Sequence, residues 1–406
     1  MGGIAGIFKL DGQPGPFTPS IHAMSRNMKR RGPDDEGYLL SRPDGPPLPL
    51  SGQDTQPSQG LSLPYLGAER IRERLDLKAS LLLASRRLAT VDLGLRGHQP
   101  LCTSDRRFWL VFNGEIYNYA ALRARLEVEG EKFNSSSDAE VALLSFRKWG
   151  ENCLQLFNGM FAFAIWDERE KCLFCARDRL GIKPFYYSFQ EGLFVFASQI
   201  RTLLSSGLVK AEPDMLGLYY GMSFGMAPRP MTSFKGISAL RPGHWLKIDQ
   251  NAGLRIQRYW RIPTGEADKS ISDSVAAETI EAKLKKAVTL RMAAEVPFAT
   301  FLSGGLDSTL VSSLAAEARH GVKAFTLLEH GMRRDQGENA RGAAAAKGMD
   351  HVVRTITEED ILASVDDIFR NDEEPFCALD PNYFISRFIA ANKVKVVLSG
   401  LGADEL

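Results

Sequence analysis

The sequence has no excess of charge of either sign, because 50 basic residues stand against 49 acidic residues and give a formal net charge of +1. No global field therefore draws the chain to nucleic acid or to an anionic membrane. No apolar run reaches the roughly 20 residues needed to cross a bilayer, and no signal peptide opens the chain. We expect a cytoplasmic protein with small-molecule substrates and with neither a nucleic acid nor a membrane partner.

Cysteine is also scarce. The five cysteines are odd in number and scattered, which argues against a disulfide framework and for a reducing compartment. Cys172 and Cys175 have the spacing of a C-x-x-C motif, but they lie in a segment typical of a β-strand, where residues three apart point to opposite faces. We therefore do not expect a redox or zinc site there.

A length of 406 residues with 44% hydrophobic content predicts two or three domains with sizeable cores. Residues 1–208 contain short apolar segments separated by Gly, Asn and Asp turns, which predicts a two-sheet α+β domain. Residues 42–79 are rich in Pro, Gly and Gln at first and predict a surface insertion of unknown function. Strands are expected at Ile4–Phe8, Leu81–Ser85, Phe108–Phe112, Met160–Trp166, Leu173–Arg177, Phe185–Ser188 and Leu193–Ala197, and helices at Tyr119–Glu129 and Asp138–Trp149.

Residues 209–406 form the second predicted domain, and from about Asp273 helices and apolar strands alternate. This alternation predicts a parallel α/β sheet. The chain stops just after an expected central strand, Val394–Leu398, so we expect a fragment whose second domain is incomplete. The other elements expected are helices at Ser274–Met292, Thr309–Ala318 and Asn339–Lys347 and strands ending at Leu302 and Leu328.

The most informative segment is the turn Ser303-Gly304-Gly305-Leu306-Asp307-Ser308, which lies between an apolar strand and a helix. The unpaired N–H groups and the positive dipole end of a helix N-terminus attract an anion, and glycines let it approach the backbone. No Lys follows the glycines, so this is not the G-x-x-x-x-G-K-[ST] loop. The turn resembles the SGG-x-DS loop of ATP pyrophosphatases, which predicts a site for the pyrophosphate of ATP.

Several further motifs stand in a fixed order along the chain, and with them the chain resembles the glutamine-dependent asparagine synthetase family over nearly its whole length. The resemblance implies an N-terminal-nucleophile (Ntn) hydrolase sandwich followed by an ATP-pyrophosphatase domain. The motifs are Gly3–Phe8, Arg31–Asp34, Arg87-Leu88, His98–Leu101, Phe112–Asn118, Ser137–Glu140, Ala176–Pro184, Pro242–His244, Ser303–Ser308, Glu374–Phe376 and Leu398–Glu405.

The resemblance implies a glutamine pocket formed by five residues, Arg87, Asn113, Gly114, Glu115 and Asp138. The chemistry of these side chains fits that role. A guanidinium suits the α-carboxylate of glutamine and the two carboxylates suit its α-ammonium. The Asn113 amide and the Gly114 N–H can together form an oxyanion hole.

In the second domain the resemblance implies a site for ATP and Mg²⁺. Asp307 and Asp404 are the expected metal ligands, and Asp404 would also lie near the substrate carboxylate as a catalytic residue. The residues expected to bind ATP or pyrophosphate are Leu302, Ser303, Gly304, Gly305, Asp307, Ser308, Leu327, Ser399 and Gly400.

The chain departs from the family at three positions. The family nucleophile is a cysteine directly after the initiating Met, and this chain has Gly2, so we expect an inactive glutaminase. Engineered inactivation, an enzyme that uses free ammonia, and a relative such as β-lactam synthetase are the three alternatives. Leu401 replaces a typical Glu, which puts aspartate as the acceptor in doubt, and Glu373 replaces a typical Asp.

The function expected from these features is ATP-dependent amide formation of the asparagine synthetase type, in which aspartate, ATP and glutamine or ammonia give asparagine, AMP and pyrophosphate. Two alternatives remain open. One is an amidotransferase for another carboxylate, such as a sugar acid or a peptide, and the other is a non-catalytic glutamine-binding homologue. The oligomeric state is also open, with a homodimer as the candidate.

Overall fold

The computed structural model of the chain describes residues 2–58, 60–265, 270–293, 295–329, 334–374 and 381–402. The chain folds into two compact units, one made of Met1–Ile262 and Glu373–Cys377 and the other of Pro263–Asp372 and Ala378–Leu406. The first unit runs well past residue 208, the predicted end of the first domain, because three strands after that residue join its sheets.

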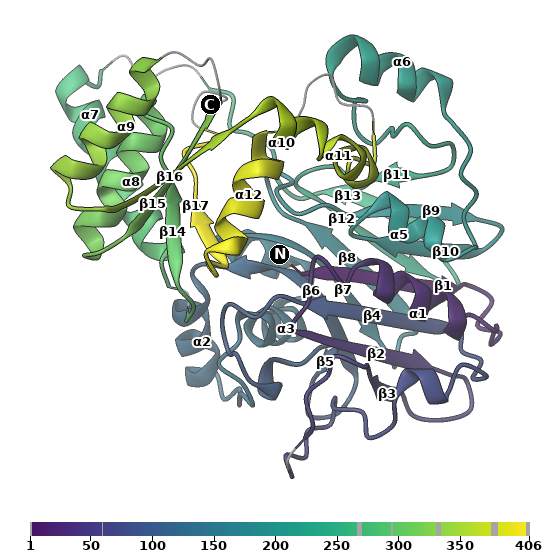
Figure 1. Cartoon of the computed structure of the whole chain (residues 1–406). Coiled ribbons are helices and arrows are strands. Elements are labelled where there is room, and N and C mark those ends of the chain that lie inside the picture. The colour runs from purple at the N-terminus through teal and green to yellow at the C-terminus, as the bar shows by residue number, and fades with distance from the viewer. Residues whose placement is uncertain are drawn as a thin grey trace. The chain divides into compact units, whose positions relative to one another are not determined.

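Two antiparallel sheets form the frame of the first unit (Figure 1). The first sheet has the strand order β11-β9-β10-β1-β4-β2-β3 and the second has the order β13-β12-β8-β7-β6-β5. The first sheet contains β1 (Gly3–Lys9), β2 (Asp35–Ser41), β3 (Leu48–Ser51), β4 (Leu81–Arg87), β9 (Tyr186–Gln190), β10 (Leu193–Ala197) and β11 (Ser238–Ala239). The second contains β5 (Leu101–Cys102), β6 (Phe108–Ile116), β7 (Gly159–Asp167), β8 (Cys172–Arg177), β12 (His244–Asp249) and β13 (Gly253–Arg258).

Helices cover the outer faces of both sheets, so the first unit has four layers in the order α, β, β, α. The alternation along β1 shows this arrangement, since Ile4 and Phe8 pack into the core shared with the second sheet while Ala5 and Ile7 pack with α1 and α5. The helices of this unit are α1 (Thr18–Asn27), α2 (Tyr119–Val128), α3 (Asp138–Trp149), α4 (Cys153–Leu156), α5 (Ile200–Ser205) and α6 (Met215–Phe224), with short 3₁₀ turns η1 (Ile71–Glu73), η2 (Leu95–Gly97) and η3 (Gly150–Asn152).

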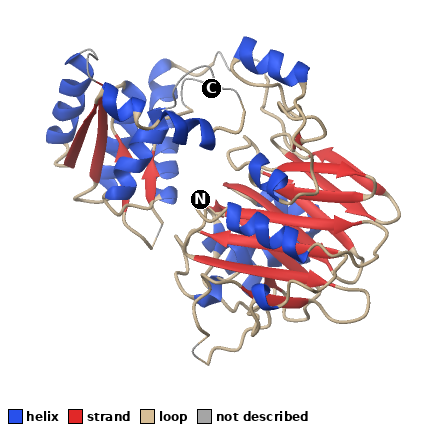
Figure 2. Ribbon diagram, turned by 45° about the vertical axis from the view of Figure 1, so that its right-hand side comes forward, coloured by secondary structure: helices blue, strands red, loops and turns tan. Residues whose placement is uncertain are grey.

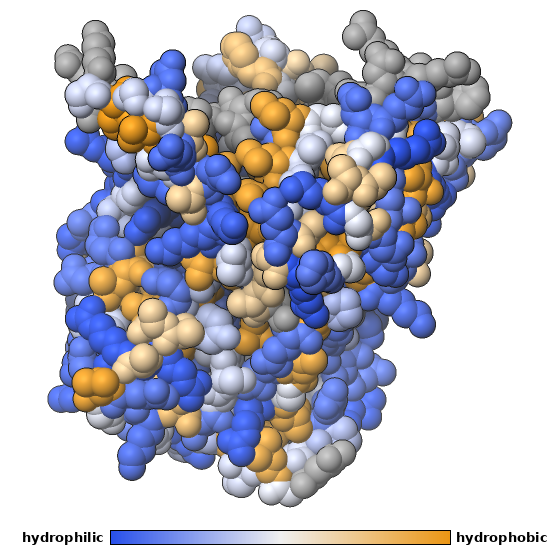
Figure 3. All heavy atoms as spheres, turned by 90° about the vertical axis from the view of Figure 1, so that its left-hand side faces the viewer, coloured by the Kyte–Doolittle hydropathy of each residue, from blue (hydrophilic) through white to orange (hydrophobic). Residues whose placement is uncertain are grey.

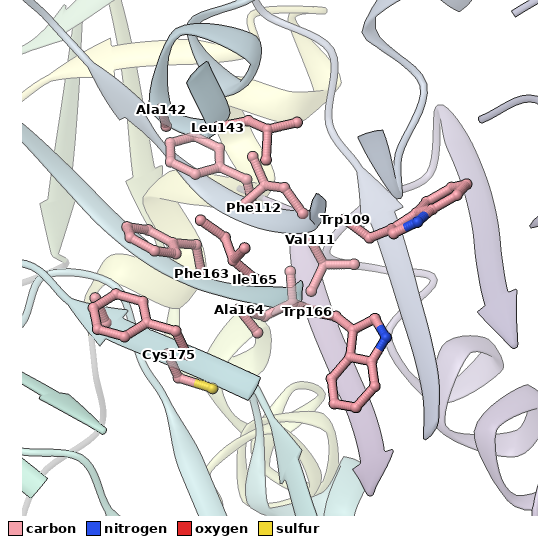
Figure 4. Packing of buried hydrophobic residues seen from close by; sticks show 14 of the residues in the cluster. Trp109, Val111, Phe112, Ala142, Leu143, Phe163, Ala164, Ile165, Trp166 and Cys175 are labelled. Carbon is pink, nitrogen blue, oxygen red and sulfur yellow. The ribbon is translucent and has the colours of Figure 1, made fainter. Parts of the chain in front are cut away.

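The largest core of the first unit uses both faces of β6 and β7. Trp109 lies opposite Trp166 in the register of the two strands, and the Trp166 ring meets Phe8 of the other sheet at a centroid distance of 5.1 Å. Phe112 of β6 and its partner Phe163 of β7 lie on the opposite face of these strands, toward α3, as Figure 4 shows. This double-sided packing explains why β6 and β7 read as nearly continuous apolar runs.

A parallel four-stranded sheet, in the order β16-β15-β14-β17, forms the centre of the second unit (Figure 2). Its strands are β14 (Phe298–Phe301), β15 (Lys323–Glu329), β16 (Asp350–Ile356) and β17 (Val396–Leu398). The helices of this unit are α7 (Asp273–Arg291), α8 (Leu306–Ala318), α9 (Arg334–Ala346), α10 (Glu358–Leu362), α11 (Val365–Asn371) and α12 (Pro381–Ala391).

The predicted fold classes, a two-sheet α+β domain followed by a parallel α/β sheet, are confirmed.

Among the described helices none is both long and apolar enough to cross a membrane. On the face drawn in Figure 3 polar residues predominate and apolar residues lie among them in smaller groups. The four cysteines of the described residues are buried free thiols, and Cys172 and Cys175 lie in β8 as expected.

Candidate functional site

A small pocket of about 40 Å³ lies in the first unit and is bordered by residues of β4, β6 and α3. Four of the five residues predicted to bind glutamine line it, namely Arg87, Asn113, Gly114 and Asp138. The fifth, Glu115, is joined to the lining by a hydrogen bond from the Thr90 hydroxyl to its Oε1 at 3.1 Å. The structure therefore brings the predicted residues together, and their role toward glutamine stays a prediction.

Asn113 gives the clearest sign that a ligand belongs in this pocket. Its side chain is 1% exposed, and among the described residues neither its Nδ2 nor its Oδ1 has a hydrogen-bond partner. A buried amide without partners costs free energy unless something else satisfies it. Next to it, a side chain on Gly114 would come within 2.3 Å of the Met160 carbonyl oxygen, so only glycine fits there.

Two carboxyl groups meet at the same pocket. Asp138 Oδ2 accepts a hydrogen bond of 2.8 Å from the Ile116 N–H. Burial raises the pKa of Asp138 to about 7, with the nearby Glu115 carboxylate acting in the same direction and the Ile116 N–H opposing it. A ligand ammonium would lower this pKa again, so the pocket is suited to an amino group.

Asp138→Asn should change stability and binding in opposite directions. Because the folded-state pKa lies above the ordinary value of 3.8, Asp138 favours folding most at low pH and loses that contribution as pH rises toward about 7. At about pH 8 the amide variant should raise the free energy of unfolding by about 4 kcal/mol, and this gain should be less than half as large at about pH 5. Urea unfolding at both pH values measures this.

Asp138→Asn should also bind glutamine more weakly, because the ionised carboxylate is the form that pairs with an ammonium. For the same reason, glutamine binding by the parent chain should strengthen as pH rises through about 7. Calorimetric titration checks this. Asp44→Asn, at an exposed position, is the matched control and should alter neither property. A stability gain independent of pH would contradict the assigned cause.

The Arg87 guanidinium is engaged within its own loop. It donates to the carbonyls of Gly94 at 3.0 Å and Val91 at 2.9 Å, and it also donates to the carbonyl of Asp92. Arg87 thus fixes the loop that carries Thr90 and Val91 to the pocket. The predicted bidentate contact with a substrate carboxylate would have to replace some of these hydrogen bonds.

Gly2 borders the same pocket, at the position where the family has its nucleophile. Its carbonyl oxygen accepts a hydrogen bond of 3.0 Å from Arg31 Nε, which holds the N-terminus beside the lining. A Cβ on residue 2 would lie 3.7 Å from Asn113 Oδ1 and 2.8 Å from the Arg86 carbonyl oxygen. A side chain at residue 2 would therefore point at the unpartnered amide, after a small shift of the terminus.

The sequence assigned no role to several further lining residues, among them Thr90, Gln99 and Ser137. The Gln99 side chain accepts a hydrogen bond of 2.7 Å from the Phe112 N–H and thereby supports the strand that carries Asn113. Ser137 begins α3 by accepting a hydrogen bond from the Ala139 N–H at 3.1 Å. Gln99 belongs to the motif His98–Leu101 and Ser137 to the motif Ser137–Glu140, but the motifs alone did not indicate these supporting hydrogen bonds.

The predicted pyrophosphate loop follows β14 in the second unit. The Ser303 and Ser308 hydroxyls lie 2.9 Å apart, and the Ser308 Oγ also accepts a hydrogen bond from the Ser303 N–H at 3.2 Å. Gly304 has a φ of +85°, which favours glycine, and Gly305 is the N-cap of α8. The loop thus places two hydroxyls at the N-terminus of a 13-residue helix, where an anion is stabilised.

The loops after β14 and β17 lie next to each other. A Cβ on Gly400 would come within 2.7 Å of the Ser308 backbone nitrogen, so the loop containing Ser399 and Gly400 is packed against the start of α8. The chain continues from β14 to β15 on one side, while β17 lies on the other, so a topological switch point falls between β14 and β17. Parallel α/β sheets bind ligands at such a point.

The structure describes three of the remaining residues predicted to bind ATP or metal, Leu302, Leu327 and Asp307, and does not describe Asp404. Leu302 is buried at the end of β14 and its N–H donates to the Phe325 carbonyl, while Leu327 lies on the neighbouring strand β15. Asp307 lies in the first turn of α8. Asp404 lies outside the described residues, and within the described part no group of three His, Cys, Asp or Glu could hold a metal ion. The Mg²⁺ ligands stay a prediction.

Glu373, one of the departures from the family, lies at the N-terminus of α5. Its carboxylate accepts hydrogen bonds from the N–H groups of Ile200 at 2.7 Å and Arg201 at 3.1 Å, at the N-terminus of α5. The adjacent Glu374 binds Arg229 at 2.7 Å and accepts a hydrogen bond of 3.0 Å from the Ser233 N–H. These contacts lie within the first unit and attach residues 373–374 to it.

Comparison with family models gives two matches. Residues 73–260 match a glutamine amidotransferase domain and residues 279–406 match asparagine synthase. Glutamine-hydrolysing asparagine synthetase 3 of Bacillus subtilis is 41% identical over 238 residues, which is 58% of this chain and 38% of that protein. A protein of Methanocaldococcus jannaschii named for asparagine synthetase is 30% identical over an alignment of 429 residues. The alignment covers 100% of this chain and 75% of that protein.

The chain spans between 38% and 51% of the length of five matched asparagine synthetases. Amidase chyE of Penicillium rubens is 30% identical over 340 residues, with 79% of this chain and 50% of that protein covered. Among solved structures, glutamine phosphoribosylpyrophosphate amidotransferase of B. subtilis matches 98% of this chain and 92% of its own at 16% identity, with a TM-score of 0.46.

Proposed function

The chain belongs to the glutamine-dependent asparagine synthetase family, and from this premise we propose that it is an ATP-dependent amide-forming ligase with an inactive glutaminase pocket. The reaction would join a carboxylate, with aspartate as the first candidate, to ammonia. ATP would be cleaved to AMP and pyrophosphate. The observation that carries the proposal is the loop Ser303–Ser308 at the switch point between β14 and β17.

The residues of the loop suit the release of pyrophosphate. The substrate carboxylate oxygen would attack the α-phosphorus of ATP, and the bond from that phosphorus to the bridging oxygen would break. The Ser303 and Ser308 hydroxyls and the first-turn N–H groups of α8 would hold the departing pyrophosphate. Asp307 would hold Mg²⁺, with Asp404 as the second candidate ligand, and a bound Mg²⁺ would supply neutralisation of the phosphate charge.

The acyl adenylate would then react with ammonia. The nitrogen of ammonia would attack the acyl carbon, the bond from that carbon to the phosphate oxygen of AMP would break, and loss of one proton from the nitrogen would give the amide. In the first unit, Asn113, Glu115 and Asp138 would bind glutamine through its amide and its ammonium. Gly2 has no side chain to form a thioester, so ammonia would have to come from solution.

Exchange of labelled pyrophosphate into ATP tests the proposal. We expect exchange that depends on a carboxylate, with aspartate tried first and then sugar acids and peptide carboxylates. Ser308→Ala should lower the exchange rate about 10- to 150-fold, the loss of one hydrogen bond to a charged group. Thr309→Ala, the neighbouring residue in α8 outside the assigned loop, is the control and should exchange at the parental rate. Absence of exchange with every acid would overturn the ligase.

A second candidate is ligation of a carboxylate other than aspartate. Leu401 favours it, because leucine cannot accept the proton or the hydrogen bond that glutamate accepts. The match to a protein named an amidase agrees with a wider range of substrates in this group. The exchange assay separates the two candidates, since it reports which acid supports adenylate formation.

A further inference from the structure

A second cavity of the first unit, of about 400 Å³, lies between α1 and the segment at residues 42–79 whose function the sequence does not give. Helix α1 lies along the first sheet beside β4 (Figure 1). The helix lines one wall of the cavity with Arg26 and Lys29, and the segment lines another with Arg70 and Arg72. The size is that of a pocket for a small molecule.

Positive charge predominates in this cavity. Its lining contains five cationic side chains, those of Arg26, Lys29, Arg70, Arg72 and Arg86, against the two carboxylates of Glu36 and Asp54. The chain as a whole is close to neutral, so this excess of three positive charges is local. Clefts lined by one sign of charge concentrate ions of the opposite sign.

The two carboxylates are already paired with two of the cations. Arg86, which is 2% exposed, forms ion pairs with Glu36 and, at 2.5 Å, with Asp54. Asp54 is also bound by Lys29 at 2.9 Å. These pairs hold the floor of the cavity together and leave no carboxylate of the lining for the remaining arginines.

Arg26 and Arg70 have no ion-pair or hydrogen-bond partner for their side chains among the described residues, and Arg72 only approaches Glu73, at 4.0 Å. The arginines of the segment are fixed in place by Ile71, which lies between them, is 1% exposed, and packs in the same core as Ile21 and Met24 of α1. Unpaired guanidinium groups therefore face one cavity from two walls that share a core.

We propose that this cavity is a binding site for a small phosphorylated metabolite, with Arg26 and Arg70 as the principal phosphate ligands. Guanidinium groups bind phosphate oxygens through paired N–H donors, which favours phosphate over a single carboxylate. The 42–79 segment would then serve to complete this site. The proposal is independent of the ligase assignment, because neither Arg26 nor Arg70 belongs to the pyrophosphate loop or lines the glutamine pocket, although Arg86 borders both cavities of the first unit.

Calorimetric titration with inorganic phosphate and with ribose 5-phosphate, at low ionic strength, tests the site. We expect Arg26→Gln/Arg70→Gln to weaken binding of either probe by about 100-fold, since each of the two charged hydrogen bonds contributes about tenfold. Arg30→Gln/Arg258→Gln removes the same charge from two exposed positions outside the cavity and should bind like the parent chain. Both variants should melt at the parental temperature, because their side chains are not core.

Four results would overturn the proposal. The first is absence of phosphate binding by the parent chain. The second is equal weakening in the control pair, which would mean a general charge effect. The third is loss of binding in Ser308→Ala, which would place the anion on the loop of the second unit. Tighter binding of citrate than of ribose 5-phosphate would likewise exclude the phosphate assignment.

Discussion

Replacing Gly2 with cysteine should give the chain a glutaminase activity, whereas we expect no release of glutamate from the chain as it stands. The pocket beside residue 2 already holds the unpartnered Asn113 amide, and a Cβ on residue 2 would lie 3.7 Å from its Oδ1. Asn113 and Gly114 are then placed to stabilise the oxyanion formed when the thiolate attacks the glutamine amide. The Cβ would also lie 2.8 Å from the Arg86 carbonyl oxygen, so the terminus must shift by a few tenths of an ångström.

The measurement is glutamate release by Gly2→Cys protein whose Met removal and free thiol are confirmed by mass spectrometry. Gly2→Ala is the matched control, because it adds the Cβ without the sulfur and should stay inactive. Adding Asn113→Ala to Gly2→Cys should lower the rate about 100- to 1000-fold if the amide forms the oxyanion hole. A processed Gly2→Cys protein no more active than Gly2→Ala would show that the pocket lacks more than a nucleophile.

Asp307→Ala should reduce ATP–pyrophosphate exchange below detection. Asp307 is the one acidic residue in the first turn of α8 and the first predicted ligand of Mg²⁺. Charge that develops as pyrophosphate departs would lose its neutralisation, which is a larger loss than one hydrogen bond. Binding of glutamine, assigned to the other unit, should not change.

The control for this variant is Asp350→Ala, an exposed aspartate of the same unit that pairs with Lys323 at 3.6 Å. It removes the same charge and should exchange at the parental rate. If Asp307→Ala exchanged as fast as the parent chain, the loop Ser303–Ser308 would be a structural turn. The ligase assignment would then fail, while the glutamine pocket would be untouched.

The sequence predicted many of the elements with a strong apolar pattern and missed β2, whose burial depends on polar partners. Strand β2 was missed because it begins with Asp35 and Glu36, which look like turn residues. In the structure both are buried, since Asp35 binds His98 at 2.8 Å and Glu36 binds Arg86. A local sequence pattern cannot predict these ion pairs, because His98 and Arg86 lie far from Asp35 and Glu36 in the sequence.

The same limit applies to the glutamine pocket. Resemblance supplied Asn113 and Asp138, and the structure places both in one pocket. It gave no sign that Arg87 donates to the carbonyls of its own loop, because hydrogen bonds of a side chain to nearby backbone depend on how that loop folds. The charge of the second cavity was equally hidden, since its arginines come from two segments that meet only in the folded chain.

The attachment of Glu373 and Glu374 to the first unit bears on how the protein folds during synthesis. The main body of that unit ends at Ile262, yet the N-terminus of α5 and the Arg229 side chain find their carboxylates only when residues 373 and 374 have been made. A ribosome adding about 5 to 20 residues per second needs on the order of ten seconds for that interval. Over this time the N–H groups at the start of α5 and the Arg229 side chain of the nascent first unit lack these two carboxylate partners.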